Sequence, residues 1–364
     1  MLKDAIPLDQ IRRALVIKLR HHGDVLLSSP VLSVLKSHVP HAEIDALVYA
    51  ETAEMLSLHP ALAQLHVIDR NWKKLGALQY LSAEWRLLKA LRDRHYDLIV
   101  HLTDHPRGAW ITYMCNARWA VTRRIGGRGR WWRKAFTHTY PTPANARRHT
   151  VEQHLDALRR IGIQPTPQER RLVLVPGHAA EARITTLLTE AGLNGRPFIH
   201  IHPASRWFFK CWDSHRMAHL INRLQAGGHT VVLTAAPDTT ERKMIDEIQS
   251  KTRTPAVSFA GQLSLKELAA LTARARLFIG VDSAPMHIAA AMNTPVVALF
   301  GPSGDKEWGP WDGPLGSSHR IVTSLAHPCR PCGMDGCAGS KISDCLASLP
   351  LEPVWHAVQE LLAQ

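Results

Sequence analysis

The sequence has no long hydrophobic run and no recognisable export signal. No apolar segment approaches the ~20 residues that span a bilayer, although 45% of the 364 residues are hydrophobic. The first residues, MLKDAIPLDQIRRALVIKLR, lack the uninterrupted apolar core and small-residue cleavage site of a signal peptide. We therefore expect a globular protein that stays in the cytoplasm.

Acidic residues are missing from one long stretch. Between Asp104 and Glu152 there is no Asp or Glu, and four tryptophans are interleaved with basic side chains. Most of the net charge of +13 arises there, from Arg107, Arg118, Arg123, Arg124, Arg128, Arg130, Arg133, Lys134, Arg147 and Arg148. Two interpretations remain open: a solvated basic surface, or a face for phospholipid headgroups, a phosphorylated glycolipid or nucleic acid.

Cysteine is scarce, and four of the six cysteines lie near the carboxyl terminus. Cys329, Cys332, Cys337 and Cys345 have the spacing C-x2-C-x4-C-x7-C. This spacing permits a zinc or iron–sulfur site, but it lacks the paired C-x2-C knuckles of a typical zinc site. A cytoplasmic location disfavours stable disulfides. We expect no bound metal, and a metal site at these four cysteines is the alternative.

The first half of the chain alternates short apolar strands with helices. Strands are predicted near 11–18, 43–49, 65–68 and 96–102, and helices at 25–38, 51–58, 75–94 and 149–161. Strands that are apolar throughout, such as 14–17, are typical of parallel sheets buried on both faces. The alternation predicts a doubly wound parallel sheet.

The second half repeats this alternation. Strands are predicted at 198–201, 230–233, 277–281 and 295–300, and helices at 213–225 and from a capping box at 264–267 to about 275. Two nearby prolines, Pro165 and Pro167, indicate a linker. We predict a first domain at 1–165, a linker at 166–178, a second domain at 179–350, and a helix at 351–364 that packs back across the domains.

The stretch RLFIGVDSAPMHIAAAMNTPVVALFGPSG, residues 276–304, predicts a strand, a short helix and a second strand. Asp282 or Ser283 can cap the helix, and Pro285 suits its first turn. Bare backbone N–H groups and the positive end of the helix dipole then point into the preceding loop. We expect a phosphate group to bind there.

Asp24 follows Gly23 after the first strand, where ligands bind in open α/β sheets. Its carboxylate is a candidate general base, with a simple helix cap as the alternative. Lys18, Arg20, His21 and His22 lie nearby and are candidates for binding phosphate.

Two further loops follow strands of the second half. Ser205, Arg206 and Lys210 present a hydroxyl and two cations, which suits a diphosphate, although a polar surface loop is the alternative. Asp238 and Glu241 are placed either for a ribose diol or as helix caps.

Three blocks in this order resemble glycosyltransferase family 9, the lipopolysaccharide heptosyltransferases, over essentially the whole chain. The blocks are VIKLRHHGDVLLSSPVLSVLK, IHPASRWFFKCW and FIGVDSAPMHIAAAMNTPVVALFGPSG. The RHHGD form and the WGPW at 308–311 are most similar to the heptosyltransferase III subgroup.

The resemblance implies a GT-B fold, with an acceptor-binding first domain and a donor-binding second domain across a cleft. It implies inverting transfer of heptose from ADP-L-glycero-β-D-manno-heptose to an inner-core heptose on lipid A, without a required metal. The family's base matches Asp24, and its donor-binding residues match Asp282, His287, Ser205 and Lys210. Arg123, Arg124 and Arg128 would then meet acceptor phosphates and the anionic inner membrane leaflet.

Three other functions remain as alternatives. The first is heptose transfer at another inner-core position. The second is a nucleotide-sugar epimerase or hydrolase on the same fold, because fold does not fix function. The third, suggested by the net charge of +13, is a nucleic-acid-binding protein. We expect no nucleic-acid partner and a monomer.

Overall fold

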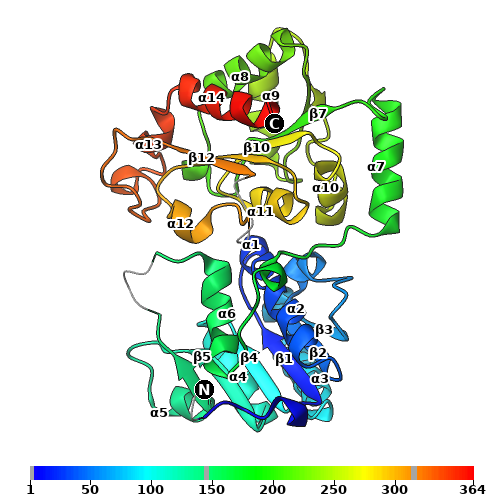
Figure 1. Ribbon diagram of the computed structural model, residues 1–364, viewed down its shortest axis with the longest axis vertical. Helices are drawn as coiled ribbons and strands as arrows, with labels where there is room; N and C mark the ends of the chain where they lie inside the picture. Colours follow the sequence, from blue (N-terminus) through cyan, green and yellow to red (C-terminus); the bar gives the residue numbers. More distant parts are fainter. Residues whose placement is uncertain (1–3, 143–146, 313–317) are drawn as a thin grey trace. The chain divides into compact units, whose positions relative to one another are not determined.

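The computed structural model describes residues 4–142, 147–312 and 318–364. The chain forms two compact units that divide between Val175 and Pro176, inside the linker predicted at 166–178. Each unit contains one six-stranded sheet with helices around it (Figure 1). Within these ranges, no helix has both the length and the apolar character needed to cross a membrane.

The first sheet is parallel throughout, and its first strand lies in the middle. The order is β3-β2-β1-β4-β5-β6. The strands are β1 Arg13–Ile17, β2 Glu43–Tyr49, β3 Gln64–Ile68, β4 Leu98–His101, β5 Trp119–Arg123 and β6 His138–Tyr140. The chain adds strands on one side of β1 and then on the other. The switch point, where ligands bind in such sheets, therefore lies between β1 and β4.

The helices of the first unit connect these parallel strands. They are α1 His22–Leu26, α2 Ser29–His38, α3 Ala77–Asp93, α4 Pro106–Cys115, α5 Arg130–Lys134 and α6 Thr150–Arg160. Short 3-10 helices occur at η1 Leu8–Gln10, η2 Ala50–Met55, η3 Arg70–Lys74 and η4 Gln168–Arg170. The segment predicted as a helix at 51–58 is thus the 3-10 helix η2.

The single helix predicted at 25–38 is wrong, because the chain forms two helices there. Helix α1 ends at Leu26 and α2 begins at Ser29, with Pro30 in its first turn. Proline lacks an amide N–H and clashes with the preceding turn, so a continuous helix cannot run through it. The hydroxyl of Ser28 donates to the carbonyl oxygen of Val25 at 2.6 Å and helps to close α1.

The second sheet has the same plan. Its parallel strands have the order β12-β11-β10-β7-β8-β9, which places the switch point between β7 and β10. The strands are β7 Phe198–His202, β8 Thr230–Leu233, β9 Val257–Ser258, β10 Leu277–Val281, β11 Val296–Phe300 and β12 His319–Thr323. The two units together confirm the predicted pair of doubly wound sheets.

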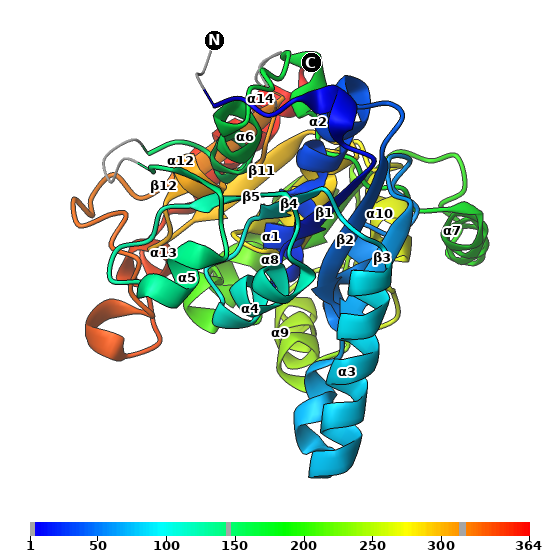
Figure 2. The same ribbon diagram turned by 90° about the horizontal axis from the view of Figure 1, so that it is seen from below.

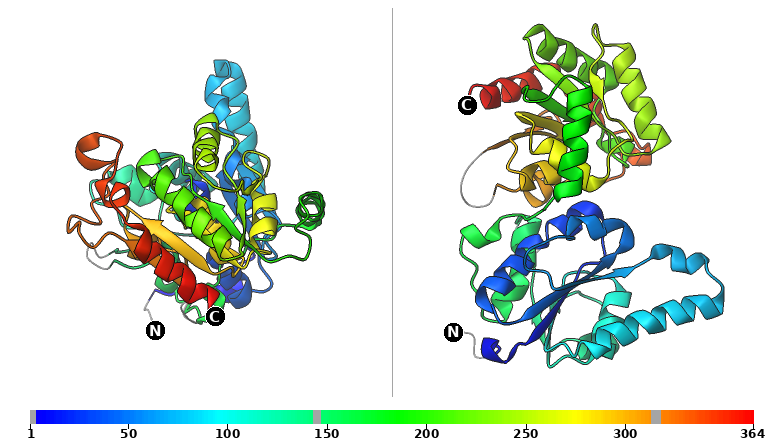
Figure 3. Two further views of the ribbon diagram at one scale, coloured as in Figure 1. Left: turned by 90° about the horizontal axis from the view of Figure 1, so that it is seen from above. Right: turned by 90° about the vertical axis from the view of Figure 1, so that its right-hand side faces the viewer.

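The helices of the second unit include the predicted capping box. They are α7 His178–Glu190, α8 Ser214–Ala226, α9 Thr239–Ser250, α10 Leu265–Thr272, α11 Ala284–Ala291, α12 Asp305–Trp308, α13 Asp344–Ala347 and α14 Leu351–Leu362, with 3-10 helices η5 Phe208–Lys210 and η7 Cys337–Gly339. Ser264 and Glu267 cap α10 reciprocally. Figure 3 shows α14 beside the second sheet.

The carboxyl-terminal helix α14 belongs to the core of the second unit. Its buried residues Val354, Ala357, Val358 and Leu361 join the same apolar cluster as strands β7, β10 and β11. The sequence analysis instead placed this helix across the domains. Its apolar stripe packs where β11 and β12 offer a matching apolar face, and α8 lies beside it.

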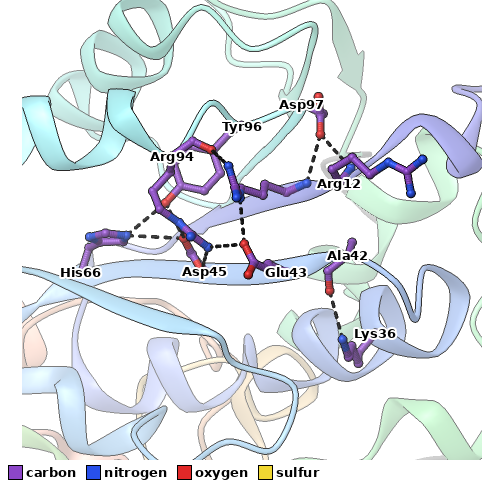
Figure 4. Close-up of polar contacts among 10 residues, drawn as sticks. Arg12, Lys36, Ala42, Glu43, Asp45, His66, Arg94, Tyr96 and Asp97 are labelled. Carbon is purple, nitrogen blue, oxygen red and sulfur yellow. Dashed lines mark hydrogen bonds and ion pairs between the residues drawn. The ribbon is translucent and has the colours of Figure 1, made fainter.

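A buried carboxylate ties the first sheet to the end of α3 (Figure 4). Asp45 on β2 is fully buried and accepts hydrogen bonds from Arg94 Nε at 2.8 Å and Tyr96 Oη at 2.7 Å. His66 Nε2 lies 3.5 Å from the same carboxylate. Burial alone would raise the pKa of Asp45, but these hydrogen bonds outweigh burial and lower it below its ordinary value.

We expect Asp45→Asn to lower the stability of the first unit by about 3 kcal/mol, because the buried partners lose their anion. Thermal unfolding followed by circular dichroism measures this. A carboxylate with a lowered pKa stabilises the fold above the pKa it has when unfolded, and that stability is lost as pH falls through the folded value. The difference between wild type and variant should therefore shrink in acid.

Glu43→Gln is the matched control. Glu43 also accepts from Arg94, at 2.9 Å, but its side chain is 49% exposed. Exposed ion pairs contribute at most about 1 kcal/mol. Equal losses in the two variants would contradict the assigned importance of the buried carboxylate.

Candidate active site

A buried ammonium group marks the switch point of the first sheet. Lys18 follows β1 and is 5% exposed. Its Nζ donates to the carbonyl oxygen of Leu102 at 3.0 Å, contacts His154 Nε2 at 2.9 Å and lies 3.6 Å from Asp24 Oδ1. Leu102 and His154 each accept one of the three N–H groups of the ammonium group, and Asp24 lies at ion-pair distance. The charge is therefore fixed in place beside Asp24.

The contacts of His154 define its protonation. Its Nδ1 lies 3.0 Å from the carbonyl oxygen of Leu27, which can only accept, so Nδ1 carries the proton and Nε2 accepts from Lys18. Burial lowers the pKa of His154 well below its ordinary value. Burial also lowers the pKa of Lys18 to about 8, against the opposing effect of Asp24. The sequence analysis named Lys18 as a candidate for binding phosphate. In the structure its ammonium group contacts Leu102, His154 and Asp24.

Asp24 is held between two cations. It is the third residue of α1, whose cap position is occupied by His21, so it is not a simple cap. Its Oδ1 lies 3.6 Å from Lys18 Nζ and 3.6 Å from Arg20 Nε. Its side chain is 12% exposed, so the carboxylate remains accessible. This arrangement fixes one carboxylate at the carboxyl edge of the first sheet.

Asp104 is a second carboxylate at this edge that the sequence analysis did not single out as a site residue. It follows β4, the neighbour of β1 across the switch point, and its Oδ1 lies 3.9 Å from Arg20 Nη1. Arg128 donates to its carbonyl oxygen at 2.7 Å. The sequence could have indicated Asp104, because it is an acidic residue just after a predicted strand, as Asp24 is.

The other residues predicted to bind acceptor phosphates lie around this edge of the sheet. His22 Nε2 contacts the carbonyl oxygen of Glu51 at 2.8 Å, and His21 is exposed. Arg123 and Arg124 are exposed at the end of β5, two strands away from β1. Of the predicted set, the structure brings Lys18 and Arg20 directly to Asp24.

An ion pair occupies the switch point of the second sheet. Lys210, at the end of η5, donates from Nζ to Asp282 Oδ2 at 2.6 Å. Asp282 directly follows β10, whereas Lys210 lies on the loop after β7, so the contact joins the two sides of the switch point. Among the residues that the structure describes, Lys210 Nζ makes this one hydrogen bond, so two of its three N–H donors remain for an anionic ligand.

Helix α11 begins beside this ion pair, and its first turn is not capped by a side chain. Ser283 occupies the cap position, but its hydroxyl donates to the carbonyl oxygen of Val281 at 3.3 Å. Pro285 lies in the first turn, as predicted. His287 lies one helical turn after Ser283 and is 4% exposed. The positive end of α11 therefore faces the same loops as Lys210.

The loop after β7 carries the remaining candidates for the diphosphate. Ser205 is 4% exposed, and its Oγ accepts from the backbone N–H of Trp207 at 3.3 Å. Arg206 is exposed and stacks over the Trp207 ring at 5.4 Å. Ser205 is thus fixed by its own turn, whereas Arg206 extends toward solvent.

Asp238 is a helix cap, one of the two roles considered for it. Its Oδ1 accepts from the backbone N–H groups of Thr240 at 2.8 Å and Glu241 at 3.2 Å. Glu241 has a different environment: it is 5% exposed and accepts from the N–H of Ala236 at 2.9 Å. Burial raises the pKa of Glu241 above its ordinary value.

A buried chain of hydrogen bonds ends beside Glu241. Thr272 donates to a carbonyl of its own helix, so it accepts from His200 Nδ1 at 3.0 Å. His200 Nε2 then accepts from Thr234, whose hydroxyl oxygen accepts from His202 Nδ1. Burial lowers the pKa of His202 to about 4, so its imidazole is neutral. Its Nε2 is an acceptor 3.9 Å from Glu241 Oε2.

The four carboxyl-terminal cysteines do not form a metal centre in the structure. Across the described ranges, no group of three or more His, Cys, Asp or Glu side chains is placed to hold a metal ion. Cys329, Cys332 and Cys337 are exposed thiols, whereas Cys345 is buried. Burial raises the pKa of the Cys345 thiol.

The chain matches the model of glycosyltransferase family 9 (heptosyltransferase) over residues 84–342. It is 39% identical over 295 residues to lipopolysaccharide heptosyltransferase 3 of Escherichia coli, covering 80% of this chain and 84% of that protein. Lipopolysaccharide heptosyltransferase 1 of Pseudomonas aeruginosa is 26% identical over 323 residues, covering 88% of this chain and 86% of the relative.

Solved structures agree with this fold. A family 9 glycosyl transferase from Veillonella parvula superimposes with a TM-score of 0.83 at 21% identity, covering 99% of each chain. The E. coli heptosyltransferase WaaC with ADP superimposes with a TM-score of 0.73 at 19% identity, covering 96% of this chain and 99% of that one. The fold is GT-B, and the chain belongs to glycosyltransferase family 9, the heptosyltransferases.

Proposed function

We propose that the chain transfers heptose from ADP-heptose to an inner-core heptose of lipopolysaccharide, as a heptosyltransferase of the type III subgroup. The observation that carries this proposal is the anion site at the switch point of the second sheet, formed by Lys210 and the start of α11. In a family 9 chain that is 39% identical to a lipopolysaccharide heptosyltransferase 3, such a site suits the diphosphate of a nucleotide sugar.

The second unit binds the donor. Lys210 turns its two remaining donors to the diphosphate, and Ser205 and Arg206 add a hydroxyl and a second cation. The amino end of α11 stabilises the negative charge, with Ser283 and His287 in its first turns and Asp282 alongside. Glu241 accepts from the ribose hydroxyls, whereas Asp238 supports this loop as the cap of α9. The E. coli WaaC structures with ADP and with an ADP-fluoroheptose support this choice of donor.

The first unit supplies the base. The acceptor hydroxyl passes its proton to the Asp24 carboxylate while its oxygen forms a bond to the anomeric carbon of the donor. The bond from that carbon to the diphosphate oxygen breaks, and ADP leaves from the opposite face with inversion of configuration. Lys18 is a positioning residue, because its fixed ammonium group holds the carboxylate in place at 3.6 Å.

The charge that develops on ADP is stabilised by protein groups, so no metal cofactor is required. Lys210, Arg206 and the start of α11 supply positive charge and N–H donors where the leaving diphosphate forms. Fixed donors of this kind stabilise a leaving group without reorganisation at the moment of reaction.

The acceptor is a lipid A core oligosaccharide, which places the enzyme on the cytoplasmic face of the inner membrane. Arg123, Arg124 and Arg128, together with His21 and His22, lie around the carboxyl edge of the first sheet and bind acceptor phosphates. The chain acts as a peripheral monomer and needs no nucleic acid.

The acceptor is tested with truncated lipid A cores that end at different inner-core sugars. Each is incubated with the protein and ADP-heptose and analysed by mass spectrometry. We expect one added heptose on the core that already carries two. Addition to a shorter core would still support heptose transfer but would assign the chain to another subgroup. Consumption of ADP-heptose without addition to any core would favour an epimerase or hydrolase and contradict the proposal.

Asp24→Asn should lower turnover by about 10²–10⁴-fold, because the amide cannot take the acceptor proton. ADP affinity, measured by calorimetry, should stay nearly unchanged, since Asp24 lies on the other unit from Lys210. Asp104→Asn is the matched control, because Asp104 occupies the equivalent position after β4. A larger loss in Asp104→Asn than in Asp24→Asn would assign the base to Asp104.

Lys210→Ala should weaken ADP binding by roughly tenfold to a hundredfold, which corresponds to a charge-assisted hydrogen bond of about 1.5–3 kcal/mol. Calorimetry with ADP measures this without any acceptor. Lys251→Ala is the control, because Lys251 follows the last residue of α9 and pairs with Glu247 of that helix, away from the switch point. An ADP affinity that is the same in wild type and Lys210→Ala would refute the assignment.

A further inference from the structure

Helix α3 exposes an apolar face that the proposed reaction does not use. Leu78, Leu81 and Trp85 are 83%, 60% and 63% exposed, and their spacing of three and four residues places them on one side of the helix. The buried residues of the helix are Ala83, Leu88 and Leu91, of which Leu91 belongs to the apolar core around the first sheet. Figure 2 shows the amino-terminal end of α3 projecting beyond the sheet of the first unit.

The surroundings of this face are basic. From residue 69 to residue 93, the chain carries six cationic and three acidic side chains; the cations are Arg70, Lys73, Lys74, Arg86, Lys89 and Arg92. Arg70 forms an ion pair with Glu51 and Lys89 with Asp93, and Glu84 forms one with Arg107. Lys73 and Lys74 are exposed in η3, just before α3 begins. The apolar face therefore lies next to a segment of net positive charge, with the exposed Lys73 and Lys74 at its amino end.

We propose that this face of α3, with the lysines of η3, binds the surface of an anionic lipid bilayer. Leucine side chains enter the acyl boundary, tryptophan prefers the membrane interface, and nearby lysines attract anionic headgroups. Leu78, Leu81 and Trp85 provide the apolar part, and Lys73 and Lys74 provide the charge. This segment lies outside the basic stretch between Asp104 and Glu152.

A second copy of the chain fits this surface less well. A two-fold contact through the exposed face would bring the basic segments of both copies together, and like charges at an interface oppose association. A lipid surface of opposite charge has no such cost.

Neighbouring helix α4, which packs against α3, also exposes aromatic side chains at Trp110 and Tyr113.

The test is flotation of the full-length protein with lipid vesicles, without donor or acceptor, so that its outcome is independent of sugar transfer. We expect binding to phosphatidylcholine vesicles that contain phosphatidylglycerol, and much weaker binding to phosphatidylcholine alone. Raising the salt to molar concentration should weaken binding, because the Debye length falls to about 3 Å. Equal binding to both vesicle types would overturn the role of charge.

Two variants and a control locate the surface. The triple variant Leu78→Ser, Leu81→Ser, Trp85→Ser should lower vesicle binding at least about tenfold, and Lys73→Glu, Lys74→Glu should lower it similarly. Both should keep wild-type ADP affinity, which reports an intact second unit, and wild-type circular dichroism. Leu325→Ser, at a residue 96% exposed in the second unit, should have no effect.

Three outcomes would overturn the proposal. The first is wild-type vesicle binding by the triple variant. The second is an equal loss of binding in Leu325→Ser. The third is a dimer in light scattering that the triple variant abolishes, with no vesicle binding by the wild type, which would assign the face to contact between copies.

Discussion

The central position of the first strand in each sheet determines where chemistry is possible in this protein. Because β1 and β7 are laid down first and strands are added on both sides, the connections diverge at β1/β4 and at β7/β10. Backbone groups and polar side chains can gather there without disturbing either apolar face. Asp24, Lys18 and Asp104 lie at the first of these points, and Lys210 and Asp282 at the second.

The two switch points are built in different ways. In the first unit the positive charge is buried: Lys18 is held by hydrogen bonds to Leu102 and His154 and lies 3.6 Å from Asp24, so the carboxylate has a rigid neighbour. In the second unit the Lys210–Asp282 pair is partly exposed, with 21% of the lysine side chain accessible. Under the proposed function, a base must be held still and a phosphate group must be able to enter, and the two arrangements are consistent with those needs.

The sequence predicted the two sheets, because apolar strands are local signals, whereas the roles of the site residues stay predictions. It missed β5, β6, β9 and β12, which are short or partly exposed; in β5 and β6 a basic and aromatic composition hides the alternation. The break at Pro30 was visible in the sequence but was overridden by the apolar pattern. The partners of Lys18 could not be predicted, since His154 lies 136 residues away and meets it only through the fold.

The hydrogen-bonded chain from Thr272 to His202 places two histidines in the interior of the second unit. Both histidines in it are neutral, with the pKa of His202 lowered to about 4 by burial, so neither exchanges a proton near neutrality. Lys18 in the first unit is different, since its pKa of about 8 allows it to lose its charge in mildly alkaline solution. A buried group that can lose its charge in mildly alkaline solution thus lies beside Asp24, whereas the two buried histidines of the second unit stay neutral from near-neutral to alkaline solution.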